Sequence, residues 1–122
     1  MTMLENGNIG IGTPLNENPN NYKLAVNGTI GSKEVIIENN SLTWPDYVFS
    51  QDYLPMTIYD LQEYIKLNQH LPDVPSATET DQYGISIGEM NCILLKKIEE
   101  MTLYIIDLQI QIDALKQSIE KK

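Results

Sequence analysis

The chain has 122 residues and a mass of 13.9 kDa, and 42% of its residues are hydrophobic. This apolar content excludes a disordered acidic tail, and the apolar runs are too short to span a bilayer, so we expect no membrane insertion. The formal net charge is -9 and every basic residue is a lysine, which argues against nucleic-acid binding because Arg is the best donor for phosphate and base contacts.

The N-terminal part predicts short, Gly-rich β-strands. Asn8–Gly12 alternates Ile with small or polar residues, which is typical of a strand with one buried face. Tyr22–Ile30 predicts a hairpin with a type I′ turn at Asn27-Gly28, because both residues tolerate positive φ. Lys33–Glu38 predicts a further strand. Strands of this size cannot bury a core alone, so we expect further copies of the chain to cover them.

A cluster of aromatic residues opens a small acidic head. Trp44, Tyr47 and Phe49 place three aromatic side chains within six residues. Such a cluster predicts a core anchor, and a ligand-binding platform is the alternative. The acidic residues of the head predict a solvated surface rather than a cation site, because no DxDxDG-like calcium loop is present.

Two capping patterns predict helices inside the head. Thr57 followed by Asp60 predicts a helix that stops near Asn68 and carries one apolar face, formed by Ile58, Leu61 and Ile65. Ser76 followed by Glu79 predicts a short second helix that ends at Gly84.

Residues that could carry catalysis are sparse. His70 is the only histidine and has no Ser or Cys nucleophile motif near it, so we interpret it as structural. Cys92, the only cysteine, is expected to be an inert thiol and excludes an internal disulfide and a CxxC metal site. We therefore expect no enzyme activity, no metal and no cofactor.

The C-terminal part predicts a coiled-coil helix. Ser86 and Glu89 form a capping box that places the helix start at about Ile87. With Ile98 at heptad position a, nine of the ten a and d positions are apolar. Asn91 is the polar member, a device that commonly fixes register and chain number. These ten positions form the predicted oligomer seam: Ile87, Asn91, Leu94, Ile98, Met101, Ile105, Leu108, Ile112, Leu115 and Ile119.

The length of this helix predicts self-association. At ~1.5 Å per residue, the stretch from Ile87 to Ile119 spans about 50 Å, and a monomer of this size has no core long enough to cover it. Ile at a with Leu at d favours two strands. A second apolar stripe needs further cover, from the head folding back along the helix, and relaxes that preference; its members are Leu103, Ile106 and Ile110.

Several motifs resemble those of fibre proteins. Gly7–Thr13 and Tyr22–Ile30 resemble the segment that precedes C-terminal domains in phage tail-fibre and bacterial surface-fibre proteins. Four later motifs resemble a C-terminal module on large surface or fibre-like proteins of Bacteroidetes-type bacteria, namely Trp44–Phe49, His70–Ala77, Gly84–Asn91 and Glu100–Ile106. This resemblance implies an extracellular homotrimeric fibre end, on a cell surface or a virion, attached to an upstream fibre of the same polypeptide.

A second resemblance is to the intramolecular chaperone domain of tail spikes and fibres. It shares the order of fibre strand, small α-containing head, Leu-Pro segment and terminal coiled coil. Members of that family release themselves by autoproteolysis at a Ser within a Ser-Asp-containing motif. The corresponding segment here, Gly31–Glu34, lacks that pattern, so we do not expect self-cleavage, and Ser32 is the one candidate if it occurs.

Together these features predict an α+β chain assembled as an intertwined homotrimer, with a dimer as the alternative. Its expected parts are a β-rich fibre-end segment over residues 1–43, the acidic head over 44–85 and the coiled-coil helix over 86–122. The predicted function is structural, as a chaperone-like trimerisation and assembly module of a fibre. The alternative is a receptor- or glycan-binding tip of a fibre or adhesin.

Overall fold

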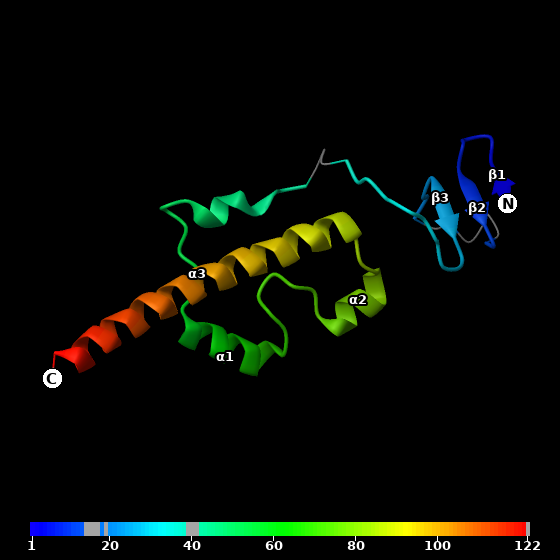
Figure 1. The fold of residues 1–122 in the computed structure, drawn as a ribbon. Coiled ribbons are helices and arrows are strands. Elements are labelled where there is room, and N and C mark those ends of the chain that lie inside the picture. The colour runs from blue at the N-terminus through cyan, green and yellow to red at the C-terminus, as the bar shows by residue number, and fades with distance from the viewer. Residues whose placement is uncertain (14–17, 19, 39–41, 122) are drawn as a thin grey trace. The chain divides into compact units, whose positions relative to one another are not determined.

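The structure, a computed structural model, describes residues 1–13, 18, 20–38 and 42–121. Its contacts divide the chain into two compact units, Met1–Ile37 and Glu38–Lys122. Among the described residues the fold is α+β, with a three-stranded sheet in the first unit and three α-helices in the second, the last of them long (Figure 1). The predicted head and the predicted coiled-coil helix therefore belong to one unit.

The sheet of the first unit contains β1 (Thr2–Met3), β2 (Ile9–Ile11) and β3 (Leu24–Val26), in that order. β1 is antiparallel to β2, and β2 is parallel to β3. Gly12, just after β2, has a φ of +67°, and a Cβ there would lie 3.3 Å from the Asn27 carbonyl oxygen. Glycine therefore permits both the positive φ and the close approach of the two backbones.

The predicted hairpin at Asn27-Gly28 is wrong. β3 pairs in parallel with β2, and the described residues from 29 to 38 form no strand, so the strand predicted over Lys33–Glu38 is also absent. The Asn27 backbone N–H donates to the Ile11 carbonyl at 2.9 Å, and its side-chain amide donates to the Gly12 carbonyl at 3.2 Å. These contacts to β2 override the local preference of Asn-Gly for a tight turn.

The second unit is built around α3 (Ile87–Glu120), with a short 3₁₀ helix, η2 (Pro45–Phe49), packed along it. α1 (Ile58–Asn68) and α2 (Ala77–Tyr83) complete the unit (Figure 1). Val48 of η2 is only 1% exposed, and Pro45 is also buried, so η2 is held by its aliphatic side chains. The head therefore packs along the first half of the long helix. The predicted cover of the second apolar stripe is wrong for Ile106 and Ile110, which stay 50% and 61% exposed because the packed head reaches only as far as Tyr104.

The capping predictions are confirmed for α1 and α2. The Thr57 hydroxyl accepts a hydrogen bond from the Asp60 backbone N–H at 3.1 Å, which satisfies an N–H of the first helical turn. The Ser76 hydroxyl accepts from the Glu79 backbone N–H at 3.2 Å. α1 ends at Asn68, as predicted.

α3 begins at Ile87, as predicted, but without its predicted capping box. Ser86 occupies the N-cap position and makes no side-chain capping hydrogen bond. The Met90 N–H donates to the Ser86 carbonyl at 2.9 Å, so the helix starts through its backbone alone. No helix in the described part of the chain is long and apolar enough to cross a membrane.

Candidate functional site

The predicted oligomer seam is an exposed stripe along α3. All ten of its side chains are exposed, Asn91 included. The nine apolar members range in exposure from 45% at Ile112 to 71% at Ile119. A continuous apolar stripe of this length is unusual on a helix that faces water, because monomeric proteins rarely expose large contiguous apolar patches.

The head packs on other faces of α3 and leaves the seam exposed. Between Ile87 and Tyr104, no buried or half-buried residue occupies an a or d position. The covered residues all lie at b, c, e, f or g, and they are Gly88, Met90, Cys92, Ile93, Leu95, Lys96, Lys97, Glu99, Glu100, Leu103 and Tyr104. The head and a helix docked on the seam would therefore not compete for the same face.

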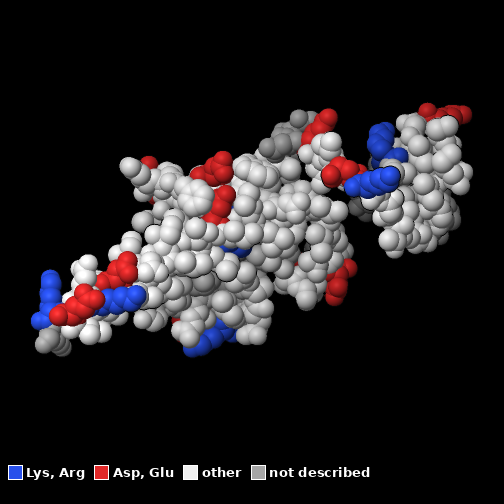
Figure 2. Space-filling view, viewed as in Figure 1, with Lys and Arg blue, Asp and Glu red and all other residues white. Residues whose placement is uncertain are grey.

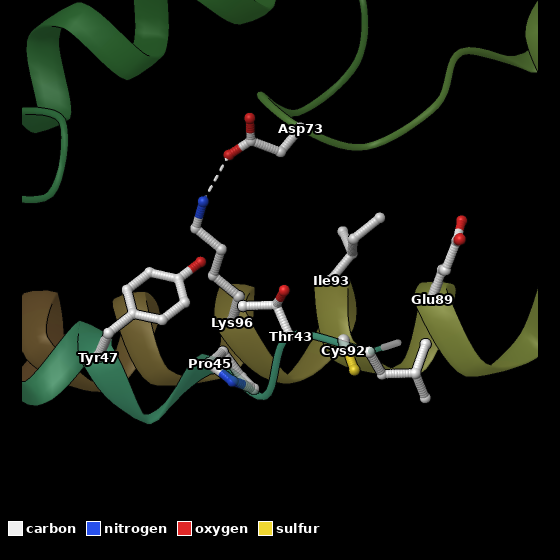
Figure 3. A pocket seen from close by; sticks show the side chains of 9 residues that line it. Thr43, Pro45, Tyr47, Asp73, Glu89, Cys92, Ile93 and Lys96 are labelled. Atoms are coloured by element: carbon white, nitrogen blue, oxygen red, sulfur yellow. Dashed lines mark hydrogen bonds and ion pairs between the residues drawn. The ribbon is translucent and has the colours of Figure 1, made fainter. Parts of the chain in front are cut away.

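A hollow of about 330 Å³ lies where η2 crosses α3 (Figure 3). Figure 3 shows the Lys96 side chain reaching from α3 toward Asp73, beside the ring of Tyr47. The Lys96 Nζ lies 5.9 Å from the centroid of that ring, within the range of a cation–π contact. The hollow is lined by Leu42, Thr43, Pro45, Tyr47, Asp73, Glu89, Cys92, Ile93 and Lys96.

A cluster of polar side chains, here called the clasp, ties two distant segments to α3. It consists of Tyr53, Asp73, Lys96, Lys97 and Glu100. The Lys96 Nζ donates to Asp73 Oδ2 at 2.7 Å, and the Lys97 Nζ lies 3.6 Å from the same oxygen. Lys97 also donates to Glu100 at 3.0 Å, and the Tyr53 hydroxyl donates to the other Glu100 oxygen at 3.0 Å. Two lysines thus balance two carboxylates.

The charges of the clasp stabilise one another. The hydrogen bond from Lys96 holds the pKa of Asp73 below its ordinary value. Burial and the hydrogen bond to Glu100 raise the pKa of Tyr53 to about 12. Burial disfavours the charge of Lys96, but the bond to Asp73 and its charge outweigh burial and raise the pKa of Lys96. At neutral pH Lys96 and Asp73 are therefore ionised and Tyr53 is neutral, which suits a structural ion-pair network.

Glu99 has a different environment from the clasp. It is 8% exposed, and its Oε2 has no hydrogen-bond partner among the described residues. Burial and the nearby charge of Asp46 raise the pKa of Glu99. An ionised, unpartnered carboxylate is unfavourable in a buried position, so ionisation of Glu99 opposes the packing of η2 on α3.

The predicted aromatic cluster is exposed within the chain. Trp44, Tyr47 and Phe49 are 53%, 43% and 54% exposed, whereas Pro45 and Val48 on the same short helix are buried. Tyr47 contacts Tyr53 edge-on, with 5.7 Å between the ring centroids. Trp44 and Phe49 therefore face outward, while Tyr47 lies beside Lys96 of α3, and the cluster does not form the core of a single chain.

The remaining residues that could carry chemistry lie in structural or exposed positions. The His70 Nδ1 lies 2.8 Å from the Leu71 carbonyl oxygen, and its ring meets Tyr64 edge-on at 5.8 Å. Cys92 is buried on α3, and Ser32 is exposed in a stretch without regular structure. The residues that the structure describes contain no group of three His, Cys, Asp or Glu side chains that could hold a metal ion.

Sequence reasoning does not find the clasp, because its members come from three separated stretches of the chain. Two features of the sequence nevertheless point to it. Lys96 and Lys97 occupy f and g positions in an otherwise mainly apolar stretch, and Asp73 follows Pro72 in a segment of restricted backbone. A pair of partly buried lysines calls for a carboxylate partner from another element.

No protein-family model, curated protein or solved structure matches this chain. The resemblance to fibre proteins stays a prediction for that reason. A case for function therefore depends on the geometry of α3, the seam and the head.

Proposed function

We propose that the chain is a self-association module whose α3 helices join as a parallel coiled coil through the seam. The observation that carries this proposal is the coincidence of two independent patterns. The a and d positions are defined by sequence period alone, and they coincide with the stripe that the head leaves exposed. Knobs-into-holes packing of such a stripe needs a second helix of the same period, which a second copy supplies.

The second half of α3 adds support because it has no cover of its own. Every residue from Ile105 to Glu120 is exposed. Isolated helices of ~12–15 residues are marginal in water, and amide–carboxylate pairs such as Gln109 with Asp113 contribute only about 0.2–0.5 kcal/mol each. Burial of the seam between copies is the term large enough to stabilise this stretch.

The resemblance to fibre proteins favours three copies over two. Outside the seam, at heptad positions b and f, Ile106 and Ile110 remain 50% and 61% exposed, so α3 carries more apolar surface than a two-stranded seam buries. We therefore favour a homotrimer, with the dimer as the alternative. No property of the seam requires another kind of polypeptide as partner.

The assembly role follows from what the rest of the chain lacks. The strands of the first unit have two or three residues each, and short strands of this kind are marginal in water. A coiled coil that brings copies together raises the effective concentration of these segments. In this proposal the module registers an upstream fibre of the same polypeptide, outside the cell, and acts as a chaperone-like assembly unit.

The proposal is tested by placing a carboxylate in the seam. Ile105→Asp buries a charge in any coiled coil that uses the seam, whereas the matched control Gln117→Asp adds the same charge at an f position. Light scattering after size exclusion should show that the first variant dissociates and the second keeps the native mass. Equal masses for both variants and the native chain would overturn the proposal, and a native dimer would overturn the trimer alone.

A second function, a ligand-binding tip, is favoured by one observation, the outward-facing aromatic cluster. Trp44 is the only tryptophan, so its fluorescence reports on this surface alone. If copies cover the cluster, association should shift the emission to shorter wavelength and reduce quenching by acrylamide. Emission of a solvated indole in the assembled protein would instead support a binding tip.

A further inference from the structure

Two apolar patches stay exposed outside the seam, one on α1 and one on α3. α1 has no buried residue, and on its apolar face Ile58 is 49% and Ile65 is 40% exposed. On α3, Ile106 and Ile110 are 50% and 61% exposed. Neither patch is covered by the described part of its own chain, so each has apolar surface available for another chain.

Two hollows lie between the apolar face of α1 and the seam of α3 in the same chain. A hollow of about 210 Å³ is lined by Leu61 of α1 and Met101 of the seam. A second, of about 510 Å³, is lined by Ile58 of α1 and Leu108 of the seam. The Tyr104 hydroxyl donates to the Met56 carbonyl and fixes the start of this region against α3. A helix docked on the seam would therefore also meet the α1 patch.

The heptad positions tell which side of the seam α1 occupies. Tyr104 and Gln111, which line the second hollow, are both at g. In a parallel coiled coil the g side of one helix faces the e side of its neighbour. On the helix surface position b adjoins e, so Ile106, at b, lies on the side of the neighbour that α1 would face.

The two patches also match in height along the helix axis. Ile58 shares its hollow with Leu103, Leu108 and Gln111. In an in-register parallel assembly, the same level of the neighbouring helix carries Ile106 and Ile110. The lateral position and the height therefore both select Ile106, whereas Ile110, at f, lies further round the helix.

Building on the proposed function, we infer that the apolar face of α1 in one copy covers Ile106 on α3 of the neighbouring copy. Each copy then covers one neighbour with its α1 face and has its own α3 covered by another copy. The same contact therefore repeats around a closed symmetric assembly. The head would act as a lateral lock between copies, and the surface around Ile58 is incomplete without the neighbour.

The test uses single cysteines in different chains. In a Cys92→Ala background, Ile58→Cys is introduced in one chain and Ile106→Cys in another, and the two are mixed, reassembled and oxidised. The inference predicts a disulfide-linked pair of unlike chains, identified by mass spectrometry. The matched control replaces Ile58→Cys with Leu67→Cys, also on α1 but away from its apolar face and 81% exposed, and should give no such pair.

Other outcomes separate the two proposals. If the mixed chains keep the oligomer mass but give no linked pair, the lateral contact is wrong and the seam proposal stands. A bond that forms only within a chain carrying both cysteines would show that α1 reaches its own α3, and also overturns the contact. Chains that are monomeric before oxidation would overturn the proposed function itself.

An equilibrium measurement gives independent evidence. Ile58→Ser and Ile106→Ser should each raise the dissociation constant of the oligomer by about tenfold, which corresponds to ~1.4 kcal/mol. The double variant should be little worse than either single one, because both substitutions remove the same contact. Full additivity of the two effects would show that these residues do not touch and would contradict the inference.

Discussion

The two halves of α3 carry the same heptad pattern in different surroundings. From Ile87 to Tyr104, η2 and the clasp cover the side of the helix away from the seam, whereas every residue from Ile105 to Glu120 is exposed. The apolar seam nevertheless continues through both halves. The comparison shows that the head covers one half of the helix while the seam stays exposed. The proposed association would supply the cover that the other half lacks.

This contrast also appears in the charges. Figure 2 shows carboxylates in separate small groups on the viewed face, and acidic and basic side chains mixed at the C-terminal end of α3. The covered half instead neutralises its charges pairwise, because Lys96 and Lys97 meet Asp73 and Glu100 within the clasp. Charge pairing in the first half anchors the head, whereas the mixed charges of the second half leave the helix soluble around its seam.

The largest expected effect separates the two halves directly. Leu94→Asp and Leu108→Asp both bury a carboxylate in the seam, and each should raise the dissociation constant by about 100-fold or more. Residue-level hydrogen exchange of the dissociated chains should show the first half still protected by the head and the stretch after Tyr104 unprotected. Equal protection of both halves in the monomer would show that the head does not stabilise the first half of α3 more than the second.

The next effect concerns the anchor of the head. Val48→Ala removes two methyl groups from the side chain that is 1% exposed and should destabilise the head by about 2 kcal/mol. Chemical denaturation should show this loss, while the oligomer mass stays native because the seam is untouched. Leu54→Ala, at a side chain that is 87% exposed, is the control and should change little.

A smaller effect is expected at the clasp. Asp73→Asn removes the charge that Lys96 and Lys97 share and keeps a residue that tolerates the observed φ of +65°. Because the Asp73 side chain is 57% exposed, the loss should be at most about 1 kcal/mol.

The pH dependence of this effect has a definite sign. The folded pKa of Asp73 is depressed, so its contribution is fully present above the unfolded value of about 3.9 and is lost as the pH falls through the lower folded value. Denaturation at a series of pH values should show the native chain and Asp73→Asn converging in acid. A difference that persists unchanged in strong acid would show that the ion pair is not its cause.

The smallest effect has the opposite direction. The folded pKa of Glu99 is raised, so its ionisation weakens folding as the pH rises from the unfolded value of about 4.3 through the folded one. Glu99→Gln should therefore stabilise the head slightly at neutral pH and make little difference in acid. Thermal melts at the two pH values measure this, and destabilisation at neutral pH would show that the carboxylate has a partner in solution.

Features that depend on neighbouring residues could be predicted from the sequence. The caps at Thr57 and Ser76 join residues three apart, and the start of α3 follows from a change to helical period. The seam is likewise a local repeat, so its position on one face was predictable. These features share one property, which is that the chain specifies them within one or two turns.

Features that join distant segments could not be predicted. The parallel pairing of Ile9 with Leu24 connects strands that are far apart in the sequence, and it overrides the strong local turn preference of Asn27. The clasp joins Asp73 to Lys96 of α3, with α2 between them in the sequence. Tertiary contacts of this kind override local propensity, and no sequence period encodes them.

The most direct test of the account is the mass of the native chain in solution. Sedimentation equilibrium over a range of concentrations should give three times the chain mass of 13.9 kDa, with dissociation on dilution. Twice that mass would keep the seam as the interface and change only the number of helices. A mass of one chain at every concentration would contradict the central claim, because the exposed seam of α3 would then have no partner.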